Sequence, residues 1–197
     1  VAAVARGAPE KFIIADMPFL SCSKGLEPAM DAVQSLMQAG ASAIKIEGDK
    51  HQVDLIEHIV EAGVPVMGHL GLTPQSIHSL GGHRVQAKAE KSAMRLFESA
   101  SRLEQAGCFS IVLECVPNKV GDCVTKRLSI PTIGIGAGPL TDGQVLVLHD
   151  LLGVDQEFSP RFLRRYANTE NVIASAVSHF HEDVVAQDYP SLEESYG

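Results

Sequence analysis

The sequence predicts an α/β fold in which helices cover a parallel sheet. Short, nearly continuous apolar runs alternate with longer segments of helical periodicity, and the runs end in a chemically active side chain or a glycine. Such strands are typical of parallel sheets buried on both faces. A doubly wound open sheet and a (β/α)8 TIM barrel both fit the pattern. We favour the barrel, because barrel enzymes build their sites from the ends of several successive strands.

The first half of the chain alternates expected strands and helices. The strands are expected over residues 11–16, 43–48 and 64–69. Apolar residues at helical spacing predict helices over residues 26–39 and 52–62, and Gly40 and Gly63, which directly follow these segments, end them. In the second of the three strands, Ile44 and Ile46 point to one face, while Lys45 and Glu47 point to the other.

The second half continues the alternation. Thr73 suits the N-cap of a helix and Pro74 its first position. The loop over residues 81–86 is either a lid or plain surface. The later elements are a helix over 88–105, a strand over 109–114, a helix of about ten residues before Ile130, a strand with its glycine turn over 132–138, a strand over 144–150, and helical segments from about 160 with a break at 167–169.

The count of strands bears on how complete the barrel is. We expect six strands, whereas a barrel needs eight, and barrels typically need about 250 residues. The chain has 197 residues and starts with Val1. We therefore expect residues 1–197 to form one (β/α) barrel domain, with about six of the eight βα units and an incomplete N-terminal side.

Composition and charge narrow the class of protein. Hydrophobic residues make up 45% and charged residues 20%, as in ordinary globular proteins. The formal net charge is −8 and basic residues are scattered, so we expect neither nucleic-acid nor membrane binding. No apolar run approaches a membrane span. The four cysteines form no C-x-x-C pair, which indicates free thiols in a reducing compartment.

Charged and ionisable side chains gather at the expected strand ends. They are Asp16, Lys45, Glu47, His69 and Glu114. Charges inside a protein must be paired, bound to a metal or used in chemistry. Asp16 and Glu47 suit Mg²⁺, which prefers oxygen ligands and acts as a Lewis acid on a chelated 2-oxo acid. Glu114 is then the candidate base, and Lys45 would neutralise the substrate carboxylate.

Each of these side chains also has a purely structural interpretation. Their repetition at four strand ends favours a shared functional role over independent structural ones. The structural alternatives are a turn cap at Asp16, an ion pair between Lys45 and Glu47, a core histidine at His69, and a lysine partner for Glu114.

Several motifs together resemble one family. They are ADMPF (15–19), KIEG (45–48), GHLGLTPQS (68–76), VLECVP (112–117), IPTIGIGAG (130–138) and DGQVLVLHDLLG (142–153). In these motifs, which extend over most of the chain, the sequence resembles the ketopantoate hydroxymethyltransferase family.

The resemblance implies a fold, a reaction and roles for residues. The fold would be a (β/α)8 TIM barrel of the phosphoenolpyruvate/pyruvate superfamily. A hydroxymethyl group would pass from 5,10-methylenetetrahydrofolate to 3-methyl-2-oxobutanoate, giving 2-dehydropantoate for pantothenate synthesis. Asp16 and Glu47 would hold Mg²⁺, Lys45 and His69 would contact the oxo acid, and Glu114 would accept the proton. Family members are cytoplasmic in bacteria, mitochondrial in some eukaryotes, and form homodecamers.

The sequence departs from the family pattern in three places. The family begins with two further βα units, which carry an Asp-Ser pair that is absent here. KIEGD (45–49) replaces the commoner KIEGG, and GGHRVQAK (81–88) replaces GGYRVQGK. Two alternatives therefore stay open: a carbon–carbon lyase acting on a 2-oxo acid, and a truncated barrel without catalytic activity.

Overall fold

The computed structural model describes residues 1–197, which form two compact units, Val1–Val145 and Leu146–Gly197. The first unit contains the whole sheet, and the second contains two helices and the loop between them. The expected organisation as one domain stays a prediction.

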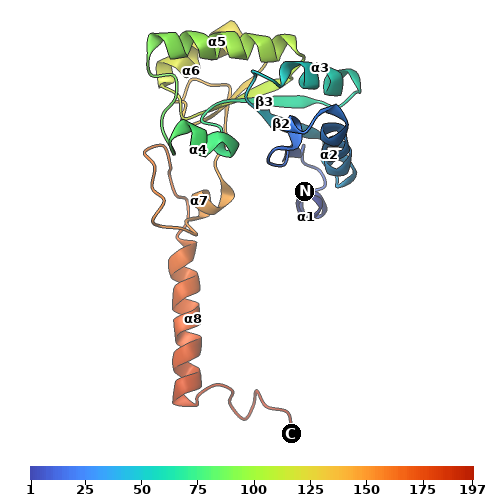
Figure 1. The fold of residues 1–197 in the computed structure, drawn as a ribbon. Coiled ribbons are helices and arrows are strands. Elements are labelled where there is room, and N and C mark those ends of the chain that lie inside the picture. The colour runs from blue at the N-terminus through green and yellow to red at the C-terminus, as the bar shows by residue number, and fades with distance from the viewer. The chain divides into compact units, whose positions relative to one another are not determined.

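The sheet of the first unit has six parallel strands in the order of the chain (Figure 1). The strands are β1 (Ile14–Asp16), β2 (Ala43–Glu47), β3 (Val66–Gly71), β4 (Ser110–Glu114), β5 (Thr132–Ile135) and β6 (Gly143–Gln144). Each strand pairs with the next one along the chain. A doubly wound sheet reverses its order at a switch point, and this sheet does not. The sheet is therefore a curled half-barrel, and the closed eight-stranded barrel stays a prediction.

Four long helices connect the strands, and they confirm the predicted helices to within two residues at each end. Figure 1 shows α3, α5 and α6 gathered along one side of the sheet. Thr73 and Pro74 open a short 3-10 helix as predicted, although no side chain caps it. The helices of this unit are α1 (Ala2–Gly7), α2 (Leu26–Gln38), α3 (Val53–Glu61), α4 (Ile77–Leu80), α5 (Glu90–Gln105) and α6 (Asn118–Arg127), with 3-10 turns η1 (Ser21–Ser23) and η2 (Pro74–Ser76).

The hydrophobic core lies between the sheet and these helices. Ile44 and Ile46 of β2 are completely or almost completely buried there. Gly68 of β3 allows α5 to approach closely, because an added Cβ would lie 2.8 Å from Cδ1 of the buried Leu103. The core thus occupies one face of the sheet, and the opposite face carries polar side chains together with the buried Met67 and Val112.

The sixth predicted strand is wrong over most of its length. β6 ends at Gln144, and Leu148–Leu152 forms the helix α7 instead. The strand lies at the edge of the sheet and pairs with β5 alone, and the last bond there joins Val145 N to Gly134 O at 3.0 Å. A short apolar run is compatible with either a strand or a helix, so the sequence pattern could not separate the two.

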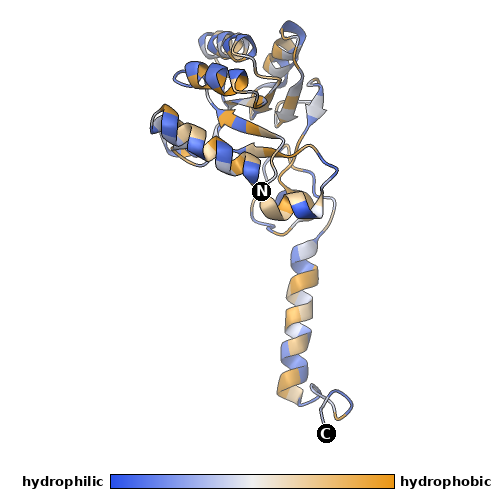
Figure 2. Cartoon of the chain, turned by 90° about the vertical axis from the view of Figure 1, so that its right-hand side faces the viewer, coloured by the Kyte–Doolittle hydropathy of each residue, from blue (hydrophilic) through white to orange (hydrophobic).

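The helix predicted from about residue 160 is also wrong over its first part. Residues 160–168 form no helix, with a turn at 161–162 and a bend at 166, and α8 begins only at Thr169 (Thr169–Ala186). The Arg165 guanidinium donates to the backbone oxygens of Gln156 and Phe158, at 3.2 and 2.7 Å. These bonds hold the segment as a loop. In Figure 2, hydrophobic and hydrophilic residues follow one another along α8, none of whose residues is buried. None of the helices combines the length and apolarity needed to cross a lipid bilayer.

Candidate active site

The strand register brings the polar strand ends together. Asp16 lies opposite Lys45 across β1 and β2, and Glu47 lies opposite His69 across β2 and β3. Glu114 ends β4, opposite Gly71 of β3. Because alternate residues of a strand share a face, Lys45 and Glu47 point away from the helix-covered face of the sheet, on which Ile44 and Ile46 lie.

All five residues singled out in the sequence belong to one connected cluster. The Lys45 ammonium pairs with the Asp16 carboxylate and lies 3.2 Å from Nδ1 of His69. On the other side of the ring, His69 Nε2 lies 3.1 Å from Oε2 of Glu114. Glu47 Oε1 lies 3.9 Å from His69 Nδ1. Two of the structural alternatives named other partners than the structure shows. Lys45 forms its ion pair with Asp16 and not with Glu47, and Glu114 lies next to a histidine and not a lysine.

The ring of His69 is at the centre of the cluster and is 2% exposed. An ammonium group can only donate hydrogen bonds, so Nδ1 accepts from Lys45 and the ring proton lies on Nε2. Although Glu114 is close, Nε2 makes no hydrogen bond. The buried Nε2 is thus paired with the Glu114 carboxylate by proximity and without a well-formed hydrogen bond.

Glu47 is held by a residue that the sequence interpretation missed. Gln75 donates its backbone N–H to Glu47 Oε2 at 3.0 Å, and its side-chain amide donates to the Met17 carbonyl at 2.8 Å. Gln75 lies in the first turn of η2, where backbone N–H groups have no partner within the helix. The Thr73-Pro74 start signal could therefore have indicated free N–H donors, although not which carboxylate they bind.

The electrostatic environment of Glu47 favours a nearby cation. Burial raises the pKa of the Glu47 carboxyl, and the charge of Asp16 adds to that increase. The Gln75 N–H and the charges of His69 and Lys45 act in the opposite direction. Two carboxylates that repel each other in a partly buried site are stabilised by a positive charge between them.

The donor set fits a hard cation that keeps part of its hydration. No group of three His, Cys, Asp or Glu side chains is arranged to hold a metal. Asp16 and Glu47 can supply two carboxylate ligands, and Asp16 is accessible because 62% of its side chain is exposed. Mg²⁺ is commonly bound by one or two carboxylates together with waters and substrate oxygens. The chemistry of the site therefore suits Mg²⁺, with the other ligands coming from outside the chain.

Two cavities adjoin Glu47. The smaller has a volume of about 120 Å³ and lies against the turn after β1, while the larger has about 500 Å³ and lies toward α5. The smaller cavity is lined by Met17, Phe19, Leu20, Cys22, Ser23, Glu47, Gln52, Gln75 and Ser76. Of the cluster, Glu47 thus faces both cavities.

The fold and the site together define a class of protein. A singly wound parallel sheet with ionisable side chains at the C-terminal ends of several strands is the arrangement of enzymes of the (β/α)-barrel type. Among solved structures, a putative phosphonomutase from Burkholderia cenocepacia matches with a TM-score of 0.53 at 12% identity, covering 68% of this chain and 56% of that one. A phosphoenolpyruvate phosphomutase from Streptomyces platensis matches with 0.51 at 14% identity, covering 89% and 62%. These likenesses support the fold alone.

Sequence comparison identifies the family. The family model described as ketopantoate hydroxymethyltransferase matches residues 1–192. The 3-methyl-2-oxobutanoate hydroxymethyltransferase of Coxiella burnetii strain CbuK_Q154 is 53% identical over 194 residues, which is 98% of this chain and 73% of that protein. The protein of the same name from Bdellovibrio bacteriovorus is 52% identical over 195 residues, covering 99% and 74%. The chain belongs to the ketopantoate hydroxymethyltransferase family, and it spans about three quarters of the length of these relatives.

Proposed function

We propose that this protein transfers a hydroxymethyl group to 3-methyl-2-oxobutanoate, giving 2-dehydropantoate, as its named relatives indicate. The observation that carries the proposal is the cluster of Lys45, His69 and Glu114, in which a cation, a buried imidazole and a carboxylate lie next to one another. Such a cluster can bind a 2-oxo acid and remove a proton from the carbon beside its ketone.

Lys45 and His69 bind and orient the substrate. The Lys45 ammonium, 18% exposed, neutralises the carboxylate of the oxo acid. His69 donates its Nε2–H, which makes no well-formed hydrogen bond to the nearby Glu114, to a substrate oxygen. Both groups are fixed by the β2–β3 pairing and by their mutual hydrogen bond, so little ordering is needed when the substrate binds.

Glu114 is the proposed general base. Its side chain is 16% exposed, and its Oε2 lies next to the donor that orients the substrate. A carboxylate at this position removes the C3 proton, and the resulting enolate attacks the methylene carbon of 5,10-methylenetetrahydrofolate. The methylene carbon carries no oxygen, so water supplies the hydroxyl oxygen of the product and tetrahydrofolate leaves.

Asp16 and Glu47 are the proposed holders of Mg²⁺. When bound, the ion would act as a Lewis acid that makes the C3 proton more acidic. Gln75 keeps Glu47 in position through its backbone N–H. We also propose a cytoplasmic homo-oligomer, a decamer on the family resemblance.

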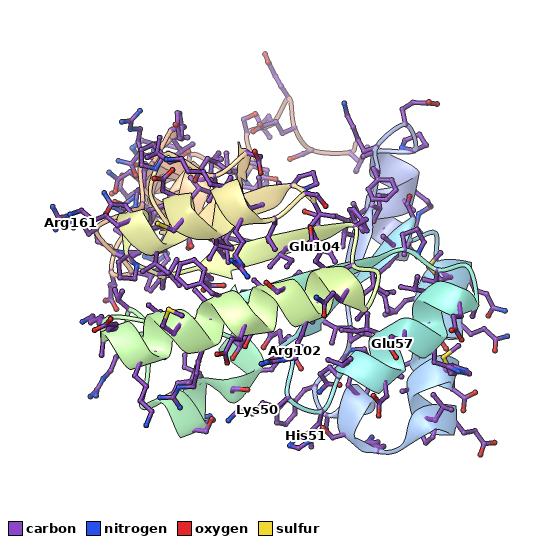
Figure 3. The ribbon with its side chains drawn as sticks, turned by 90° about the horizontal axis from the view of Figure 1, so that it is seen from above. Lys50, His51, Glu57, Arg102, Glu104 and Arg161 are labelled. Atoms are coloured by element: carbon purple, nitrogen blue, oxygen red, sulfur yellow. The ribbon has the colours of Figure 1, made fainter.

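The role of Glu114 can be tested by hydrogen exchange. A Glu114→Gln variant should still bind 3-methyl-2-oxobutanoate but lose C3 proton exchange in D₂O by at least about a hundredfold, the lower range for general acid–base catalysis. The matched control is Glu57→Gln on α3, whose side chain is exposed on the outer helix layer (Figure 3). Exchange at the wild-type rate in Glu114→Gln would remove Glu114 from the role of base.

A further inference from the structure

Gln75 is hydrogen-bonded to both of the strand ends that carry the proposed metal ligands. Its backbone N–H donates to Oε2 of Glu47, the last residue of β2, at 3.0 Å. Its side-chain amide donates at 2.8 Å to the carbonyl of Met17, which directly follows Asp16 at the end of β1. One residue therefore joins the ends of two neighbouring strands to the segment that follows β3.

The bond to Glu47 decides how this carboxylate faces the cluster. Gln75 occupies Oε2, and the Glu47 side chain is 11% exposed. The other oxygen, Oε1, lies 3.9 Å from Nδ1 of His69, which is too far for a hydrogen bond. Oε1 is thus the oxygen best placed to bind a cation, on the side of the carboxylate that faces the histidine.

The bond to Met17 fixes the turn from which Asp16 projects. Met17 is 2% exposed, and its N–H donates to the Lys45 carbonyl at 3.0 Å. With the Gln75 amide on its carbonyl, both polar backbone groups of this buried residue are paired. The Asp16 side chain is 62% exposed, so its place depends on the ion pair with Lys45 and on the backbone of Met17, and not on burial.

The segment that carries Gln75 is itself held firmly. Leu72 is 1% exposed, and its N–H donates to the backbone carbonyl of Glu114 at 2.8 Å. Pro74 opens η2, and its ring fixes the backbone angle φ immediately before Gln75. A residue on a rigid segment can hold two metal ligands at a set separation.

We propose that Gln75 is a positioning residue of the metal site. Through its bonds to Glu47 Oε2 and to the Met17 carbonyl, it sets the separation of the Asp16 and Glu47 carboxylates, and this separation determines the affinity for a divalent cation. The inference rests on the proposed function, because it takes these two carboxylates as the holders of Mg²⁺. Replacing a residue that orients metal ligands typically costs about 10- to 100-fold in metal affinity.

The test is the binding of Mg²⁺ to the full chain, measured by isothermal titration calorimetry. Gln75→Met keeps the length and charge of the side chain and removes its amide, so it should weaken Mg²⁺ binding about tenfold. Gln75→Ala loses the same bond without adding a long apolar side chain, and it should weaken binding by a similar factor. Gln34→Met, at an exposed position of α2, is the matched control and should bind Mg²⁺ like the wild type.

The dependence of C3 proton exchange on Mg²⁺ separates positioning from a purely structural role. In Gln75→Met the Mg²⁺ concentration for half-maximal exchange should rise about tenfold, while the rate at saturating Mg²⁺ stays close to that of the wild type. A structural role would lower the resistance to urea and leave the Mg²⁺ affinity of the folded protein unchanged. Wild-type Mg²⁺ affinity in both Gln75 variants would overturn the proposal, and so would an absence of Mg²⁺ binding to the wild type.

The two measurements also distinguish failure of this proposal from failure of the proposed function. Exchange by the wild type, with unaltered Mg²⁺ affinity in the Gln75 variants, would reject the positioning role and keep the proposed reaction. Mg²⁺ binding that both variants weaken, without exchange by the wild type, would support the positioning role and reject the reaction. Absence of both Mg²⁺ binding and exchange would reject the two together.

Discussion

The close approach of α5 to β3 makes a quantitative prediction for Gly68 and Leu103. A Cβ at Gly68 would lie 2.8 Å from Leu103 Cδ1, and Leu103 is fully buried, so its side chain cannot move aside freely. Overpacking of this kind costs roughly 1–3 kcal/mol. The loss of glycine flexibility in the unfolded chain offsets about 0.4–1 kcal/mol of that. We therefore expect Gly68→Ala to lower the free energy of unfolding by about 1–2 kcal/mol.

The double variant separates overpacking from other causes. Leu103→Ala alone should cost about 2–5 kcal/mol, because it leaves a cavity. In that background the new methyl at position 68 meets no Cδ1 and fills part of the space. Gly68→Ala should then be neutral or stabilising, which corresponds to a coupling energy of roughly 1–3 kcal/mol between the two sites.

Urea unfolding followed by circular dichroism at 222 nm measures these free energies. Leu96→Ala, also a buried leucine of α5, is the matched control, because Leu96 is not among the three nearest contacts of a Cβ at Gly68. Its cost should add to that of Gly68→Ala. An equal cost of Gly68→Ala in the wild-type and Leu103→Ala backgrounds would refute the proposed packing.

Three further changes test other parts of the structure. Arg102→Met leaves the Asp49 carboxylate, 8% exposed, without its ion pair, and should lower the free energy of unfolding by about 2 kcal/mol in urea titrations, while an unchanged value would contradict the pairing. Burial raises the pKa of the Cys108 thiol to about 12, so the unfolded chain loses this proton first as the pH rises. The stability of the wild type relative to Cys108→Ala should accordingly fall by about 1.4 kcal/mol between pH 8 and pH 10, and a constant difference would contradict the burial. Hydrogen bonds from the Ser129 hydroxyl and N–H lower the pKa of Glu104, so its contribution to stability is present at neutral pH and is lost as the pH falls through the acid range. Glu104→Gln should therefore show a weaker loss of stability on acidification, measured by thermal melts from pH 6 to pH 3.

The sequence predicts the sheet and the positions of the site residues well, because both depend on local pattern. The alternation of apolar and charged residues along 43–48 identifies which side chains point away from the core, and parallel strands bring their C-terminal ends to one edge of the sheet. Asp16, Lys45, Glu47 and Glu114 were therefore recognisable as strand-end residues. Their placement in one cluster is confirmed by the contacts around His69.

The missed features depend on contacts between distant residues. Gln75 holds Glu47 across 28 positions of the chain, and a glutamine at a helix start gives no sign of that partner. Arg165 keeps 160–168 from forming a helix by binding backbone carbonyls, which no periodicity records. The short β6 follows from its place at the sheet edge, where it pairs with one neighbour.

The central claim is that the cluster around His69 removes the C3 proton of a bound 2-oxo acid. Proton NMR of 3-methyl-2-oxobutanoate in D₂O with this chain, with and without Mg²⁺, tests it most directly. We predict Mg²⁺-dependent loss of the C3 proton signal in the absence of any folate. A C3 signal that persists with Mg²⁺ present and the chain folded would contradict the claim that these residues form a working enolisation site.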